Sequence, residues 1–319
     1  LGHGWAKPDK HIASHFTDPC LRCQINIEYT DGTNEVVAPT DNSWKVKNSA
    51  IHYNGLFQGE LYDARYETPD WASTICDESS WEQAVAIDGP TGEMSAMTSP
   101  ADKIMEVLKP VEFKRREDGR YEVDFGVEIS GWIRLMDITA KAGDTIRIDY
   151  ECESPQGIQR YVCNGSGKES YAPHFTWFVF RKAYISGIEQ LTSSNLQAEA
   201  VNSDVAENAV FECSNPLFNQ ILTIWKRSQK DNMHGSIASD CPHRERLPYT
   251  GDGQGACGIV MEHFDAAAFY AKWIRDVRDA QNRNDGYVPN SAPWQPGAGG
   301  GVSWGAAMNV MPWEFYLNY

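Results

Sequence analysis

The hydrophobic pattern of the chain changes its period near residue 206. Before that point, segments such as "YEVDFGVEIS" at 121–130 alternate apolar and polar residues between turns rich in Asp, Gly, Asn and Pro. A period of two is typical of strands with one buried face. After that point, "NPLFNQILTIW" at 215–225 spaces apolar residues as one face of a helix does. The pattern therefore predicts an α+β multidomain protein, with N-terminal antiparallel β-sandwich domains followed by helices.

The polar stretch "DGPTGEMSAMTSPADK" at 88–103 divides the β-rich part. We expect a first sandwich at 1–103, incomplete at its start, a second at 104–205 and a helical domain at 206–319. After the helix that follows residue 214, further helices are predicted at 258–282 and from Ala306 onwards. The apolar faces of these helices are too wide to cover one another, so we expect only the first portion of a larger helical domain.

The net charge of −16 argues against partners that carry a phosphate backbone. No apolar run reaches the length that a membrane-spanning helix needs, and the first residues lack the pattern of a signal peptide. We therefore expect no nucleic-acid partner and no membrane insertion. A homo-oligomer remains open.

The eight cysteines are too sparse for a disulfide scaffold. Cys20 and Cys23 form a CxxC pair, but no second pair or matching histidines accompany it as a zinc site would require. Ordinary thiols fit this pattern better than a metal or redox site. We expect neither a metal nor a cofactor.

Charge is concentrated in the segment "SDCPHRERLPYTGDGQG" at 239–255. Its acids, Asp240, Glu245 and Asp252, are spaced by five and seven residues, which matches neither a helix face nor a strand face. Prolines and glycines in the same segment indicate a loop, and loops on a rigid scaffold often carry function.

Two interpretations of this loop remain open from composition alone. In the first, Arg244 and Arg246 pair with the acids, and the loop is a salt-bridged connection. In the second, the loop is a carbohydrate site, because carboxylates and arginines bind sugar hydroxyls and aromatic rings pack on the C–H faces of sugars. Glycosidic cleavage needs a protonated carboxyl group, and a cluster of acids raises the pKa of one of its members.

The stretch "DCPHRERLPYTGDGQ" closely resembles the signature of the bacterial α-L-rhamnosidases of glycoside hydrolase family 78. Other segments resemble the same family in the same order, among them "GELYDARYETPDW", "DFGVEISGWIRLMDITAKAGDTIRIDYE", "FECSNPLFNQI" and "SWGAAMNVMPWEFYLNY". The resemblance covers essentially the whole chain. It implies that the helical segment is the first part of an (α/α)6 barrel. The location stays undecided, with the periplasm or the exterior slightly favoured and the cytoplasm possible.

The resemblance also implies roles for individual residues. Glu245 would be the general acid of an inverting glycosidase that acts on a rhamnose-containing glycan or glycoside. Side chains that would bind or enclose the sugar are Asp240, Arg244, Tyr249, Asp252 and Trp313. The family's general base is a glutamate far downstream, which the resemblance places beyond Tyr319.

Three residues depart from the family pattern. His243 stands where Gln is usual, Pro248 where Gly is usual, and Ala306 where Asp is common. None of them is the expected acid. Two other functions remain as alternatives: a carbohydrate-binding protein without catalysis, and another (α/α)6 enzyme such as a polysaccharide lyase. The acidic net charge argues against the anionic polymer that a lyase would cleave.

Overall fold

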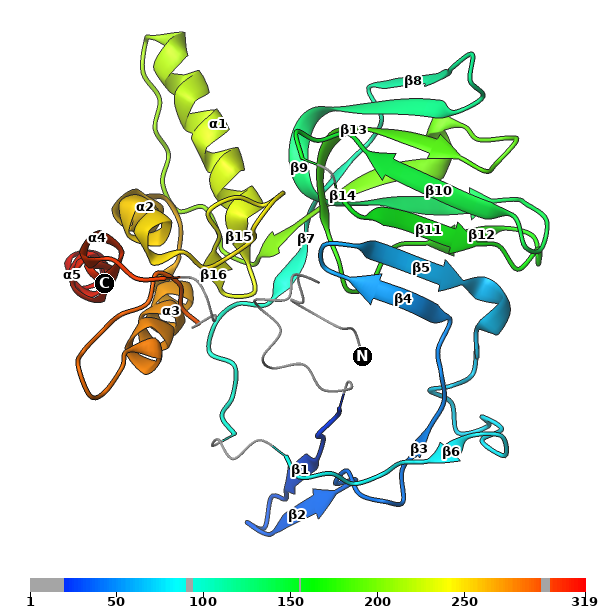
Figure 1. Cartoon of the computed structure of the whole chain (residues 1–319), viewed down its shortest axis with the longest axis horizontal. Helices are drawn as coiled ribbons and strands as arrows, with labels where there is room; N and C mark the ends of the chain where they lie inside the picture. The colour runs from blue at the N-terminus through cyan, green and yellow to red at the C-terminus, as the bar shows by residue number, and fades with distance from the viewer. Residues whose placement is uncertain (1–19, 90–93, 155, 294–298) are drawn as a thin grey trace.

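The computed structural model describes residues 20–89, 94–154, 156–293 and 299–319, and Figure 1 shows its course. Strands occupy the described chain as far as residue 203, and helices predominate from residue 216. The transition from strands to helices therefore lies where the change in hydrophobic period predicts it. None of the helices in these ranges combines the length and the apolar character needed to cross a bilayer.

Two small sheets precede the main one. Strands β1 (Ile25–Glu28) and β2 (Asn34–Val37) form the antiparallel hairpin that the alternation in this segment predicts. Their turn contains Gly32 at a φ of 83°, a conformation that favours glycine. Strands β3 (Lys45–Val46) and β6 (Glu82–Gln83) make the second small sheet. Figure 1 shows both lying apart from the large sheet.

The other strands before residue 206 form one ten-stranded sheet. They are β4 (Ile51–Gly55), β5 (Gly59–Asp63), β7 (Asp102–Leu108), β8 (Glu112–Arg115), β9 (Tyr121–Ile138), β10 (Thr145–Tyr150), β11 (Ile158–Val162), β12 (Glu169–Tyr171), β13 (Phe178–Ser186) and β14 (Leu196–Ser203). The main path runs β4-β5-β11-β10-β13-β9-β14-β7, and β8 and β12 also pair with β9. Short 3-10 turns lie at Ala64–Tyr66 and Ser193–Asn195.

Strand β9 changes its pairing partners along its length. Its first half pairs with β8 and β13, and its second half pairs with β14 and β12. The change falls at Gly131, where a Cβ atom would lie 1.9 Å from the Glu199 carbonyl oxygen, so only glycine fits. The sheet thereby folds over one apolar core, in which Val123, Ile133 and Phe180 are fully buried.

The sheet also crosses the expected boundary between the first two domains. Strand β5 pairs in parallel with β11, from Gly59 opposite Ile158 to Asp63 opposite Val162. Alternation along a strand does not identify a partner about a hundred residues away, so the sequence did not predict this pairing. The division at residue 103 stays a proposal, with the addition that residues 51–63 contribute strands to the sheet of the second domain.

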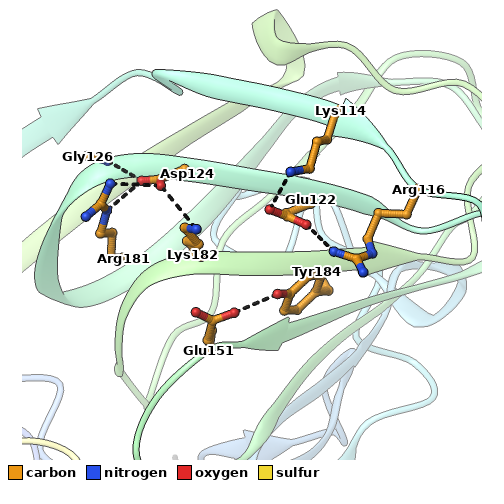
Figure 2. Close-up of polar contacts among 9 residues, drawn as sticks. All are labelled: Lys114, Arg116, Glu122, Asp124, Gly126, Glu151, Arg181, Lys182 and Tyr184. Carbon is orange, nitrogen blue, oxygen red and sulfur yellow. Dashed lines mark hydrogen bonds and ion pairs between the residues drawn. The ribbon is translucent and has the colours of Figure 1, made fainter.

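The face of β8 and β9 opposite the core carries ion pairs (Figure 2). Arg181 Nε lies 2.9 Å from Asp124 Oδ1, and Lys114 Nζ lies 3.0 Å from Glu122 Oε1. Arg116 pairs with the second oxygen of Glu122. These carboxylates are almost fully buried beneath the long basic side chains, which hold the pKa values of both acids below their ordinary range.

The helical part contains five helices within its described residues. They are α1 (Pro216–Asn232), α2 (Thr250–His263), α3 (Ala267–Ala280), α4 (Val302–Gly305) and α5 (Ala307–Asn318), and a hairpin of β15 (Met233–His234) and β16 (Ile237–Ala238) follows α1. Helices α2, α3 and α5 enclose a second core around Phe269, Tyr270 and Trp273. On α1, Leu217, Phe218, Ile221 and Ile224 are each more than half exposed. Apolar surface of this extent is usually covered by further protein.

The prediction of one helix over 258–282 is wrong. Helix α2 ends at His263, and α3 begins at Ala267. Between them Phe264 is extended and buried, and the Asp265 N–H donates to the Ala206 carbonyl at 2.8 Å. The apolar spacing is helical on both sides of the break, which is why periodicity alone joined the two helices.

Candidate active site

The charged segment connects β16 to α2, and hydrogen bonds close most of it into a compact loop. The Asp240 N–H donates to the Leu247 carbonyl, and the Leu247 N–H donates to Asp240 Oδ1, both at 3.2 Å. The Arg246 N–H donates to the Cys241 carbonyl at 3.2 Å, with Arg246 itself at a φ of 55°. This closed loop, residues 240–247, holds Glu245 close to both Asp240 and Cys241.

The prediction that the whole segment 239–255 is a loop is wrong at its end. Helix α2 begins at Thr250, so Asp252 lies in its first turn rather than in irregular structure. Helix α2 has glycine at positions 251 and 253 because aromatic rings pack directly against its backbone there. A Cβ atom at Gly251 would lie 2.4 Å from the Trp304 ring, and one at Gly253 would lie 2.1 Å from the Trp273 ring. Glycine in this helix therefore reflects close packing rather than a turn.

Asp240, Cys241 and Glu245 form a hydrogen-bonded cluster. The Cys241 thiol lies 3.2 Å from Asp240 Oδ2 and 3.0 Å from Glu245 Oε2, within reach of either carboxyl group. On its other side Glu245 Oε2 accepts a hydrogen bond of 2.6 Å from Arg244 Nε. All three clustered side chains are partly buried, whereas the Arg244 side chain is 62% exposed.

The two carboxyl groups of this cluster have opposite pKa shifts. Burial raises the pKa of Asp240, and the nearby Glu245 raises it further. Burial also acts to raise the pKa of Glu245, but hydrogen bonds from the Cys241 thiol, Arg244 and Asp240 outweigh it and lower the pKa to about 2. Of the two, Asp240 is therefore the carboxyl group that takes up a proton first as the pH falls, and Glu245 stays ionised.

The same three residues offer donor atoms that all lie within 4.8 Å of one another, a spacing that a metal ion could use. Their hydrogen bonding suits a metal-free state. Burial raises the pKa of Cys241 to about 11, so this residue is a thiol that donates a hydrogen bond, whereas a metal ligand would be a thiolate. Arg244 already neutralises the charge of Glu245.

Tyr249 lies within electrostatic range of all three predicted acids. Burial raises its pKa, and the charges of Asp240, Glu245 and Asp252 each raise it further. Asp252 is exposed in the first turn of α2, where the helix dipole favours a negative charge. That the three carboxyl groups converge on one site near Tyr249 stays a prediction.

Trp313, also predicted to contact the sugar, lies on α5 and is 58% exposed. Its ring lies tilted against that of Tyr316, with a centroid distance of 5.8 Å and an interplanar angle of 34°. In the described part of the chain, no hydrogen bond or ring contact joins Trp313 to residues 240–247. The structure therefore does not bring it into the cluster.

Trp304 is an aromatic residue near the site that the sequence did not single out. Its carbonyl accepts a hydrogen bond of 3.1 Å from Thr250 Oγ1, and its ring packs on Gly251, one residue before Asp252. The ring is 39% exposed. The glycine between Thr250 and Asp252 was the available signal, since it leaves room for a large neighbour.

Arg246 does not pair with the loop acids, contrary to the salt-bridged interpretation. Its side chain is 3% exposed and reaches the β-sheet domain, whereas Arg244 does pair with Glu245. The two arginines of this loop therefore have different environments. Only Arg244 of the two is exposed to solvent.

A cavity of about 940 Å³ lies elsewhere, along α1. It is lined by α1, by residues 207–212 and by residues 127–128 of β9. None of the six predicted site residues lines it. The cluster on the 240–247 loop is accordingly a separate feature of the surface.

Three family models match this chain in succession. The α-L-rhamnosidase N-terminal domain matches residues 1–106, the bacterial α-L-rhamnosidase concanavalin-like domain matches residues 114–202, and the bacterial α-L-rhamnosidase six-hairpin glycosidase domain matches residues 206–319. The order of β-rich domains followed by a helical domain is the order of the observed fold.

Individual relatives agree with these models. An α-L-rhamnosidase of Formosa agariphila is 32% identical over 98% of this chain and 35% of its own length. The solved α-L-rhamnosidase of Dictyoglumus thermophilum superposes with a TM-score of 0.85 at 32% identity, over 92% of this chain and 34% of that one. The Streptomyces avermitilis α-L-rhamnosidase, solved with L-rhamnose, also superposes with a TM-score of 0.85, at 28% identity over 92% and 30%. The chain spans about a third of the length of each.

Proposed function

Because the chain belongs to the bacterial α-L-rhamnosidase family, we propose that the whole protein is a glycoside hydrolase that removes terminal α-L-rhamnose. Its substrate would be a rhamnose-containing glycan or glycoside. The observation that carries this proposal is the cluster of Asp240, Cys241 and Glu245 beside an exposed arginine on a closed loop. Paired carboxyl groups with separated pKa values are what acid-assisted cleavage of a glycosidic bond requires.

We propose that Glu245 is the general acid. In the substrate-free state it is ionised, because Arg244 and the Cys241 thiol bond to its carboxylate. Arg244 is exposed, so a sugar hydroxyl can draw it away from Glu245 at small cost. Loss of that cation would raise the pKa of Glu245, so that its carboxylate takes up the proton that it then donates.

The remaining predicted residues would bind the sugar. Asp240, Arg244 and Asp252 carry hydrogen-bonding groups for its hydroxyls, and Tyr249, whose pKa all three acids raise, would supply an apolar face. Trp313 would supply an apolar wall from α5. Trp304, packed on Gly251, is a second candidate for that wall.

We propose a single displacement with inversion at the anomeric carbon. The proton of Glu245 goes to the leaving oxygen as the bond to the anomeric carbon breaks. A water molecule attacks the opposite face and loses its proton to a second carboxylate, which the family resemblance places beyond Tyr319. In inverting enzymes the two carboxyl groups are about 6.5–9.5 Å apart, which leaves room for that water.

Incubation of the full-length protein with 4-nitrophenyl α-L-rhamnoside tests this proposal. We expect release of nitrophenol, no release from the matched α-L-fucoside, and a proton NMR time course in which the β-anomer of rhamnose appears first. No turnover of any α-L-rhamnoside would contradict the assigned activity. Initial formation of the α-anomer would contradict inversion but would leave the assigned activity intact.

A carbohydrate-binding protein without catalysis is the second candidate. The low pKa of Glu245 favours it, because an ionised, arginine-paired carboxylate is an acceptor rather than an acid. The two functions differ in one measurement. A binding protein would show saturable binding of L-rhamnose by calorimetry with no release of nitrophenol from the aryl rhamnoside.

A further inference from the structure

Arg246 is the residue after Glu245, and its side chain leaves the loop for the other domain. One guanidinium nitrogen donates to the Leu56 carbonyl in the β4–β5 turn. The guanidinium carbon lies 5.4 Å from the centre of the Phe57 ring and 5.0 Å from that of Trp177. A second nitrogen lies 3.5 Å from Gln156 Oε1. The Arg246 side chain thereby attaches the acid-bearing loop to the sheet domain.

The guanidinium of Arg246 is buried without a carboxylate partner among the described residues. Its Nε atom also lacks a hydrogen-bond partner. Burial lowers the pKa of Arg246 to about 10, which leaves the group charged at neutral pH. A buried charge without an opposite charge adds little to stability, even with favourable ring contacts. Folding alone therefore gives no reason for an arginine here.

The groups that receive Arg246 are held in place independently of it. The Leu56 carbonyl also accepts a hydrogen bond of 3.1 Å from Thr176 Oγ1. The Gln156 amide bonds both backbone groups of Val179, at 2.6 and 2.7 Å. Arg246 thus binds to a preformed receptor and does not have to order it.

The Trp177 ring is also held by contacts that do not involve Arg246. It stacks on His234 with a centroid distance of 4.1 Å and an interplanar angle of 10°. His234 Nε2 in turn lies 2.6 Å from Ser130 Oγ, within the sheet domain. The receptor for the guanidinium is therefore a rigid part of the fold.

Hydrogen bonds within the loop connect the backbone of Arg246 to the side chain of Glu245. The Arg246 N–H is bonded to the Cys241 carbonyl, and the Cys241 thiol is bonded to Glu245. We propose that Arg246 is a positioning residue, which sets the location of Glu245 by anchoring the loop to the Leu56–Phe57 turn, Gln156 and Trp177 of the β-sheet domain. This inference rests on the proposed role of Glu245 as the general acid. The sheet domain would then take part in catalysis without touching the substrate.

Arg246→Met keeps the length and apolar stem of the side chain and removes the charge. Each oxygen atom that loses its hydrogen bond from Arg246 still accepts one from another group. We therefore expect the melting temperature to stay unchanged or to rise. We expect kcat for a rhamnoside with a poor leaving group to fall by about 10- to 100-fold, because a displacement of about 1 Å can cost a factor of this size. An activated aryl rhamnoside should lose less than about threefold, since it needs little proton donation.

Arg227→Met is the matched control. Arg227 also leaves the helical part for the sheet, where it pairs with Glu106 at 2.6 Å, but it lies on α1 and not on the acid-bearing loop. Its loss should change kcat for both leaving groups equally and by less than about twofold. Phe57→Leu removes one ring from beneath the guanidinium and should reproduce a smaller form of the Arg246→Met effect.

The experiment measures kcat against leaving-group pKa for full-length wild type and the three variants, together with their melting temperatures. A steeper dependence for Arg246→Met and Phe57→Leu than for wild type and Arg227→Met is expected. Parallel lines for all four proteins would overturn the positioning role while leaving the proposed activity intact. If Arg246→Met does not fold, the slope of Phe57→Leu decides alone. An inactive wild type would overturn the proposed function itself.

Discussion

At the residue scale, the proposed chemistry depends on which carboxyl group of the loop holds a proton. The pKa of Asp240 is raised, that of Glu245 is lowered to about 2, and the Cys241 thiol that bonds to both has a pKa of about 11. The exposed Arg244 also stabilises the ionised form of Glu245. We propose that substrate binding and protonation of Glu245 are coupled through Arg244.

Asp240→Asn tests this coupling through the pH dependence of kcat/KM. The raised pKa of Asp240 keeps the proton on the pair to higher pH, so the alkaline limb of the wild-type profile reflects it. Without that carboxyl group, only Glu245 with its low pKa holds the proton. We expect the alkaline limb to move to lower pH in the variant. A limb at the same pH in both proteins would show that Asp240 does not hold the proton.

Gly251→Ala tests the packing of Trp304 against the start of α2. The added Cβ atom would lie 2.4 Å from the ring, so the indole must move. We expect a loss of about 1–3 kcal/mol from overpacking, and a higher KM for the rhamnoside if Trp304 lines the sugar site. Gly255→Ala in the same helix is the control, because open space surrounds its Cβ position. Thermal unfolding should show destabilisation for the first variant and a small gain for the second.

Some of these residue-level features could be predicted and others could not. The prolines and glycines predicted that Asp240 and Glu245 lie in a loop, where the structure has them, whereas a site shared by all three acids stays a prediction. The direction of Arg246 was not predictable, because it depends on a turn at Leu56 that precedes it by 190 residues. The low pKa of Glu245 was also beyond the sequence, since it arises from hydrogen bonds that the Cys241 thiol, Arg244 and Asp240 make with its carboxylate.

At the element scale, strand β9 organises the sheet. It pairs with four other strands and changes partners at Gly131. The alternation of Tyr121, Val123 and Phe125 predicted its buried face correctly. Its partners were unpredictable, because a period of two records which face is buried and carries no information about the neighbouring strand.

Asp124→Ala tests the ion pairs on the opposite face of β9 (Figure 2). Asp124 is 3% exposed and accepts hydrogen bonds from Arg181 and from the Gly126 N–H. Its loss removes the acceptor of the Gly126 N–H and the ion pair of the half-exposed Arg181, so we expect destabilisation of about 1–3 kcal/mol in urea unfolding. Asp118→Ala removes an exposed pair with Arg120 at a turn and should cost less than about 1 kcal/mol. Equal losses of unfolding free energy in the two variants would mean that the burial of Asp124 adds nothing to stability.

At the scale of the whole molecule, buried polar groups join the sheet to the helical part. Asp231 of α1 accepts a hydrogen bond of 2.9 Å from the Ser130 N–H of β9. Burial raises the pKa of Asp231 to about 7, and the charges of Glu128 and Glu106 act in the same direction. The junction between sheet and helices therefore contains a carboxyl group that titrates near neutral pH.

Asp231→Asn should change how stability depends on pH. The folded-state pKa lies above the unfolded value of about 3.9, so the folded state retains a proton that the unfolded state has lost. The stability from this proton is present below about pH 4 and is lost as the pH rises towards 7. We expect wild type to lose about 2–4 kcal/mol over this interval through Asp231, whereas the amide of the variant keeps the hydrogen bond and has no such loss. Melting temperatures at pH 5 and pH 8 that differ equally in both proteins would contradict this.

The central claim is that Glu245 donates a proton to the leaving oxygen. Its most direct test is a series of aryl and alkyl α-L-rhamnosides, with kcat measured against leaving-group pKa for full-length wild type and Glu245→Gln. The glutamine keeps the shape and removes the proton. We predict a loss of about 10²–10⁴-fold for the poorest leaving groups that shrinks towards activated aryl rhamnosides, so that the variant has the steeper plot. Parallel plots for the two proteins would contradict the claim and show that Glu245 only binds or orients other groups.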